Sequence, residues 1–228
     1  MNAPLTPELS QELAKRIRLV RRDLTDLLVH FTRGIEPRLV EVQIPGCEDR
    51  VVSGSAREVL RKILRDGKLI GTTAWAKHEP VICFSEAPIQ EFRSICDLAS
   101  IATSDEQKPR YEPFGVAVSK KWLFQKGGRP VIYDNDKAFS AYSPEQQYRL
   151  VPFDPTNECD YTWEREWRIK GEELYLDPLQ TLVIVPTASE AFDIVTEFSD
   201  TRVVKNEEND YETLSERVWL AVSLDIFG

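Results

Sequence analysis

Apolar residues near the start of the chain recur at helical spacing. Five of them follow one another at intervals of three or four positions: Leu9, Leu13, Ile17, Val20 and Leu24. Their side chains therefore share one face of a helix. Residues 6–8 supply an N-cap, a proline at the first helical position and an acidic first turn. The pattern predicts an amphipathic helix over 7–24.

Further along, short apolar runs alternate with helical patterns. Runs rich in β-branched and aromatic residues predict strands at 27–32, 81–84, 114–118, 129–133, 163–169, 181–186 and 217–223. Helical patterns predict helices at 55–67, 88–101, 120–126, near Pro144 and at 188–198. The helix at 55–67 begins with the capping box Ser55 and Glu58 and ends at Gly67. Residues 33–54 predict a loop or an irregular hairpin, and residues 103–113 a polar loop.

This order of elements favours an α+β fold, because the strands do not alternate strictly with helices. The sequence has no internal repeat, no low-complexity tract and no interdomain linker, and 228 residues lie within the range of one domain. We therefore predict a single domain over 1–228, in which the helix at 7–24 packs on a core of roughly 27–223.

Composition sets limits on the class of protein. The chain is 42% hydrophobic and 29% charged, which is ordinary for a globular protein. No apolar run approaches the ~18 residues of a transmembrane helix, and the N-terminus lacks the features of a signal peptide. The cysteines Cys47, Cys83, Cys96 and Cys159 are far apart and form no C-x-x-C pair. We expect reduced thiols, a cytoplasmic protein, no membrane association and no metal.

The net charge of −9 discourages indiscriminate binding to nucleic acid. Residues 15–22 form the one markedly basic stretch, and on a helix such charges usually face solvent.

Polar chemistry is concentrated in three short segments, of which the first two end predicted strands. In the first, His30 and Thr32 share one face of the strand because side chains alternate. His30 is either a core histidine bonded to backbone or a binding residue. In the second, Phe84 and Ser85 end an apolar strand. This end is either a platform for a planar heterocycle or a turn in which Ser85 or Glu86 caps the next helix.

The third segment, residues 163–168, has the sequence WEREWR. In a strand, Glu164, Glu166 and Arg168 share one face. The segment is either an edge strand with salt bridges, or it places a carboxylate to hold a sugar hydroxyl and to stabilise positive charge developing on a ribose.

Several common catalytic motifs are absent. The sequence has no G-x-G-x-x-G, no P-loop, no H-E-x-x-H and no G-x-S-x-G. A nuclease with paired acids is a further alternative, which would need a divalent metal.

The order of these three segments resembles the ADP-ribosyltransferase superfamily. The matching residues are His30 with Thr32, Phe84 with Ser85, and the pair Glu164 and Glu166. Over roughly residues 27–186 the chain also looks like bacterial abortive-infection proteins of the AbiGi type and, more distantly, like DarT, a toxin that ADP-ribosylates DNA. This resemblance implies mixed or antiparallel sheets with flanking helices.

The resemblance also implies roles for individual residues, with NAD as the substrate. His30 would bind the adenosine-side ribose, and the backbone near Phe31 and Thr32 would hold the nicotinamide amide. Phe84 would stack on the nicotinamide and Ser85 would support the pocket. Glu166 would hold the nicotinamide ribose and stabilise the oxocarbenium ion, while Glu164 would orient the acceptor. Tyr133 would line the same cleft.

Two functions follow as hypotheses from this resemblance. The first is an NAD-dependent ADP-ribosyltransferase of the anti-phage defence or toxin type, acting on DNA, RNA or protein, with a cognate toxin or antitoxin partner. The second is a non-catalytic, antitoxin-like or partner-binding module on the same fold.

Overall fold

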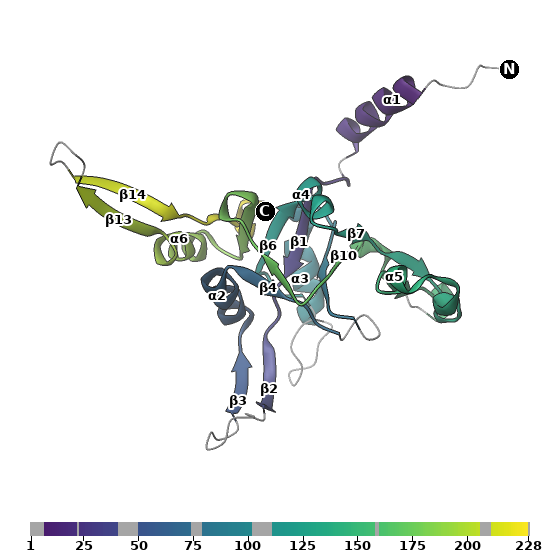
Figure 1. Cartoon of the computed structure of the whole chain (residues 1–228), viewed down its shortest axis with the longest axis horizontal. Coiled ribbons are helices and arrows are strands. Elements are labelled where there is room, and N and C mark those ends of the chain that lie inside the picture. Colours follow the sequence, from purple (N-terminus) through teal and green to yellow (C-terminus); the bar gives the residue numbers. More distant parts are fainter. Residues whose placement is uncertain are drawn as a thin grey trace.

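The computed structural model describes residues 7–21, 23–40, 50–73, 79–101, 111–157, 160–205 and 211–227 (Figure 1). The helices are α1 (Pro7–Val20), α2 (Ala56–Asp66), α3 (Phe92–Ile101), α4 (Lys120–Gln125), α5 (Pro144–Gln147) and α6 (Ala188–Glu197). The first strands are β1 (Leu27–Phe31), β2 (Ile35–Val40), β3 (Arg50–Gly54), β4 (Lys68–Ile70), β5 (Val81–Phe84), β6 (Gly115–Ser119), β7 (Arg129–Pro130) and β8 (Ile132–Asp134). The others are β9 (Leu150–Pro152), β10 (Trp167–Lys170), β11 (Glu173–Tyr175), β12 (Thr181–Val185), β13 (Asp200–Lys205), β14 (Tyr211–Arg217) and β15 (Leu220–Ser223).

The strands form several small sheets, so the α+β prediction is confirmed. The four-stranded sheet has the order β1-β6-β12-β15 and is antiparallel except for the parallel pair β12 and β15. The three-stranded sheet β5-β10-β7 is antiparallel. Two-stranded pairs are β4–β11, β2–β3, β8–β9 and β13–β14. In Figure 1 the β2–β3 and β13–β14 hairpins extend away from the central sheets.

Apolar side chains cover both faces of the four-stranded sheet. Side chains alternate along a strand, so Leu28 and Val29 of β1 belong to different cores. Leu28 joins the larger core, which contains Leu60 and Leu64 of α2 and Ile82 and Phe84 of β5. Val29 joins a smaller core that contains Phe92 of α3. The larger core therefore unites the two sheets with α2.

Helix α2 has both of its predicted ends. Ser55 accepts a hydrogen bond from the Glu58 N–H, and the Glu58 carboxylate accepts one from the Ser55 N–H. Gly67 is left-handed, with φ 66°, and its N–H donates to the carbonyl of Ile63. Helices 88–101 and 188–198 and the strands at 81–84 and 181–186 are also observed, within a few residues of their predicted bounds.

The strand predicted at 163–169 is wrong in its first half. Thr162–Glu164 is a 3-10 turn, Arg165 is left-handed with φ 45°, and β10 begins only at Trp167. The segment is therefore a turn followed by a strand, and not the continuous strand that its pattern predicted. Strands β4, β9 and β11 and the β13–β14 hairpin were not predicted.

Helix α1 is shorter than predicted and does not pack as expected. It ends at Val20, and its apolar residues Leu13 and Ile17 are 46% and 47% exposed. Figure 1 shows α1 set apart from the sheets. The predicted packing of this helix on the core is therefore not observed at these positions. Most of the predicted loop at 103–113 lies outside the described residues.

Among the described helices, none is both long and apolar enough to cross a membrane.

The capping box gives a test of local stability. Ser55→Ala removes the side-chain acceptor at the start of α2 and should lower the free energy of unfolding by about 1 kcal/mol, measured by urea denaturation. Ser140→Ala, at an exposed site, is the matched control and should change it by less than about 0.5 kcal/mol. Equal effects of the two substitutions would contradict this role of Ser55.

Candidate functional site

The three segments singled out in the sequence meet in the wall of one cavity of about 550 Å³. This volume lies in the range of small-molecule sites. Of the predicted site residues, the wall contains His30, Phe31, Phe84, Ser85, Glu164 and Glu166. Other polar wall residues are Arg33, Thr72, Thr73, Cys83, Tyr111, Tyr161 and Arg168.

Backbone pairing brings these segments together. Val29 and Ser85 form an isolated antiparallel bridge, with N···O distances of 2.8 and 2.7 Å, so β1 lies beside the end of β5. Strand β10 pairs with the other edge of β5, with Trp167 opposite Phe84. The turn that precedes β10 therefore lies at the end of β5, close to His30.

His30 is bonded to backbone, as one of the two sequence alternatives held, and its ring is neutral rather than charged. Its Nδ1 lies 2.9 Å from the carbonyl oxygen of Cys83. A carbonyl only accepts, so Nδ1 carries the proton. Burial lowers the pKa of His30 below 6.5, against the effect of this hydrogen bond. The neutral ring therefore offers Nε2 as a hydrogen-bond acceptor.

Glu166 is held in a bidentate ion pair. Arg168 donates Nε and Nη2 to its two carboxylate oxygens, at 2.7 and 3.2 Å. The side chains of Arg168 and Glu166 are only 4% and 12% exposed. Arg168 also donates Nη1 to the carbonyls of Tyr148 and Leu150, at 2.9 and 3.2 Å. The guanidinium is thus fixed by the backbone and in turn fixes the carboxylate.

Glu164 has a different partner. It is buried, and its carboxylate accepts a hydrogen bond from the hydroxyl of Tyr111. Tyr111 lies edge-to-face between Phe31 and the exposed Trp163, with ring centroids 5.4 and 5.5 Å away. An aromatic row therefore borders the Glu164 side of the cavity.

The turn that carries both carboxylates is bonded to its surroundings on each side. The carbonyl of Glu164 accepts hydrogen bonds from the Ser85 hydroxyl and the Glu86 N–H, at 2.9 and 3.0 Å. The N–H of Glu166 donates to the hydroxyl of Tyr133 at 3.0 Å, and its carbonyl accepts from the Val131 N–H at 2.9 Å. These bonds fix the directions in which Glu164 and Glu166 leave the backbone.

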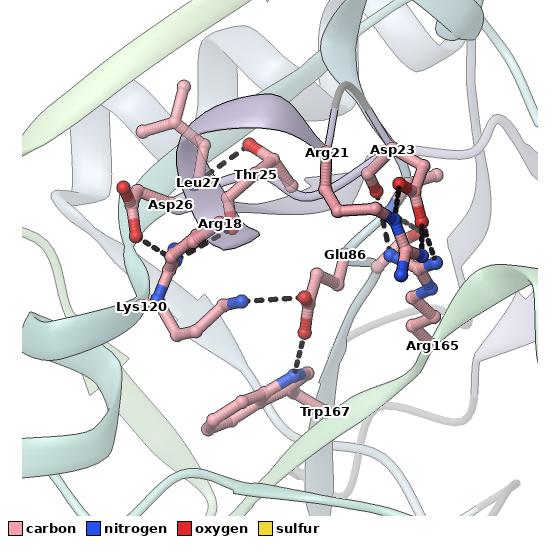
Figure 2. Close-up of polar contacts among 12 residues, drawn as sticks. Arg18, Arg21, Asp23, Thr25, Asp26, Leu27, Glu86, Lys120, Arg165 and Trp167 are labelled. Atoms are coloured by element: carbon pink, nitrogen blue, oxygen red, sulfur yellow. Dashed lines mark hydrogen bonds and ion pairs between the residues drawn. The ribbon is translucent and has the colours of Figure 1, made fainter. Parts of the chain in front are cut away.

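The second segment also anchors β10 through Glu86. Figure 2 shows its carboxylate between Lys120 and Trp167. Lys120 Nζ lies 2.6 Å from one oxygen, and Trp167 Nε1 donates to the other at 2.9 Å. Glu86 thus joins α4 to β10 and does not cap the following helical segment, which was one of the sequence alternatives.

The structure corrects the roles of three predicted residues. The ring of Phe84 is 2% exposed and belongs to the larger core, which leaves almost no surface for a stacking ligand. Thr32 lies beyond the end of β1, where its buried hydroxyl is within reach of the carbonyls of Ala56 and Phe114. Strand alternation ends at Phe31, so Thr32 does not share the cavity with His30. Tyr133 lies behind the turn and donates to the carbonyl of Tyr161 at 3.3 Å.

The surroundings of Cys83 disfavour its thiolate form. Burial and the neighbouring Glu166 carboxylate raise the pKa of its thiol well above the usual value. The sulfur is therefore protonated at neutral pH. Cys83 and Cys96 are not in disulfides, whereas Cys47 and Cys159 lie outside the described residues. In the described ranges, no group of three His, Cys, Asp or Glu residues is placed to hold a metal ion.

Sequence reasoning missed Tyr111. It raised a salt bridge to Arg168 as one alternative for residues 163–168, and the structure shows this ion pair with Glu166. Tyr111 lay in a polar stretch with no periodic signal, and no feature of the sequence pointed to it.

Comparison of the chain with protein-family models, with curated proteins and with solved structures found no match. The function must therefore be argued from the geometry of this cavity. The cavity combines a neutral imidazole acceptor, two separately bonded carboxylates and an aromatic border, a set suited to hydroxyl-bearing ligands with a planar group.

The buried ion pair predicts that removal of one charged partner lowers stability more than removal of both charges. Arg168→Met leaves the Glu166 carboxylate without its cation and should lower the free energy of unfolding by about 3–5 kcal/mol. The double variant Arg168→Met, Glu166→Gln has no uncompensated charge and should be more stable than Arg168→Met alone, as measured by urea denaturation. Additive losses would show that the two residues are not coupled.

The lowered pKa of His30 predicts a loss of stability on acidification. Below pH 6.5 the unfolded chain takes up a proton at this residue while the folded chain does not, so stability falls as pH decreases. The slope from one such group is at most about 1.4 kcal/mol per pH unit. In His30→Asn, whose amide can donate to Cys83 but does not titrate, the free energy of unfolding should fall less between about pH 7.5 and about pH 5. Parallel pH profiles for the two proteins would contradict this.

Proposed function

We propose that this protein is an NAD-dependent ADP-ribosyltransferase of the anti-phage defence or toxin type. The supporting observation is that the segments carrying His30, Ser85 and the pair Glu164 and Glu166 all border one cavity. These segments are separated by more than 50 residues in the chain, and the resemblance to the superfamily was based on the same segments.

The proposed reaction breaks the bond between the nicotinamide nitrogen and C1′ of its ribose. The bonding electrons leave with nicotinamide, which becomes neutral, and positive charge develops on the ribose. A nucleophilic atom of the acceptor then bonds to C1′ and loses its proton. The acceptor is a macromolecule, either DNA, RNA or protein, and water in its place would give hydrolysis.

Each candidate residue has a role that its surroundings support. Glu166 binds a hydroxyl of the nicotinamide ribose and stabilises the positive charge on that sugar. His30 accepts a hydrogen bond from the adenosine-side ribose through Nε2, and Glu164 orients the acceptor. The half-buried ring of Phe31 lies in the cavity wall, where it takes the aromatic contact that the buried Phe84 cannot make.

A second candidate function is supported by the ion pair of Glu166 with Arg168. Both oxygens of Glu166 accept from the guanidinium, which reduces their capacity to bind a ribose. A non-catalytic, antitoxin-like or partner-binding module would keep the cavity without turnover. Binding of NAD, measured by the thermal shift it causes, together with nicotinamide release separates the two candidates. Binding of NAD together with turnover supports the enzyme. The absence of both binding and turnover supports the module.

Glu166→Gln tests the enzyme most directly. The amide still accepts a hydrogen bond from Arg168 but leaves the buried guanidinium without its counter-charge, so the variant is less stable than the wild type. Nicotinamide release per folded molecule should fall by about 10²–10³-fold. Release is measured with NAD alone and with added DNA, RNA and protein, and the melting temperature confirms that the variant is folded.

The matched control is Glu145→Gln, at an exposed position in α5, which should keep wild-type release. Glu164→Gln should lower transfer to the acceptor more than release in its absence. A folded Glu166→Gln variant with wild-type release would show that the site is assigned to the wrong carboxylate.

A further inference from the structure

Arg165 stands between the two site carboxylates in an unfavourable backbone conformation. Its φ of 45° is the one positive value at a non-glycine residue in the described ranges. A side chain with a Cβ costs roughly 1–2 kcal/mol in this region. Such residues persist where the surrounding contacts over-determine the conformation, and they occur often at functional sites.

The contacts that hold Arg165 come from the segment between α1 and β1. Arg165 donates Nη1 to the carbonyl oxygen of Asp23 at 2.6 Å and Nη2 to its carboxylate at 2.7 Å. The guanidinium thus binds backbone and side chain of one residue, 142 positions away in the chain. Figure 2 shows Arg165 reaching Asp23 while Glu86, Lys120 and Trp167 form a separate group.

Asp23 is itself held by the residue that follows α1. Arg21 donates Nε to one carboxylate oxygen at 2.5 Å and Nη2 to the oxygen that Arg165 also uses. The bonds from Arg21 and Arg165 lower the pKa of Asp23 well below its usual range, so Asp23 stays ionised at neutral pH. The end of α1 is therefore linked through one carboxylate to the turn that carries Glu164 and Glu166.

We propose that Asp23 and Arg165 form a clamp that positions both site carboxylates, so that the N-terminal segment controls turnover. Resting on the proposed function, this assigns Arg165 as a positioning residue, because its own side chain points to Asp23 and not into the cavity wall. Ser85, Glu86, Tyr133 and Val131 hold the peptides on either side of Arg165. Arg165 itself is held by its N–H bond to the carbonyl of Thr162 and by the contact of its side chain with Asp23.

The test compares substitutions that separate the clamp from backbone strain. Arg165→Ala removes the clamp and keeps a Cβ in the left-handed region, whereas Arg165→Gly removes the clamp and suits that region. Asp23→Ala removes the carboxylate from the other side. All three should lower kcat for nicotinamide release by about 10- to 100-fold, because a displacement of about 1 Å at the reacting centre has effects of this size. KM for NAD should change much less, and Arg165→Lys should restore part of kcat.

Asp26→Ala is the matched control. Asp26 lies in the same segment and is bound by Arg18, but not by the turn. It should keep wild-type kcat. The double variant Asp23→Ala, Arg165→Ala should lose no more than either single variant, because one interaction is removed twice. A wild-type kcat in folded Arg165→Gly would overturn the proposal, since relief of strain alone would then suffice.

A second readout separates this proposal from the proposed function. The N–H groups of Arg165 and Glu166 donate to Thr162 and Tyr133, so their hydrogen exchange reports on the turn. Asp23→Ala should speed this exchange and Asp26→Ala should not. If the wild-type protein releases no nicotinamide, the proposed function fails, and exchange alone decides whether the clamp holds the turn. Unchanged exchange in Asp23→Ala would overturn the clamp.

Discussion

The two backbone hydrogen bonds between Val29 and Ser85 join the two main sheets, and the cavity depends on this junction. They connect β1 of the four-stranded sheet to the end of β5 in the three-stranded sheet. His30 follows Val29, and its ring reaches back to the carbonyl of Cys83, two residues before Ser85. The same serine then uses its hydroxyl to hold the carbonyl of Glu164. One residue thereby links all three segments, which makes Ser85 more a scaffold than a ligand-binding group.

Much of the fold was predictable where a local rule acted alone. The capping box of Ser55 and Glu58 and the left-handed Gly67 fixed the ends of α2, because these motifs depend on neighbours in the chain. Strands 81–84 and 181–186 are buried on both sides and read as continuous apolar runs. The packing of α1 was not predictable from its stripe, since periodicity shows which face is apolar and not what covers it.

The cavity wall was predictable only in part, since Thr32 and Tyr133 lie outside it and Tyr111 was missed. Residues 163–169 alternate between polar and apolar positions except at Arg165, and such alternation is typical of a strand. A turn at Arg165 overrides that pattern, because distant partners supply the stabilisation: Asp23 binds the side chain, and Tyr133 binds the next N–H. Tertiary contacts of this kind leave no periodic signal in the sequence. The buried position of Phe84 also results from tertiary contacts, because its ring packs in the larger core.

The turn also explains how two carboxylates two residues apart share a site. In a regular strand Glu164 and Glu166 would point the same way and repel each other without separate partners. The left-handed residue between them changes the direction of the chain, so Glu164 meets the hydroxyl of Tyr111 while Glu166 meets the guanidinium of Arg168. A neutral donor and a cation give two chemically identical groups different environments, which is the condition for dividing the roles of a carboxylate pair. The conformation of Arg165 thus gives the two carboxylates in this cavity wall different surroundings.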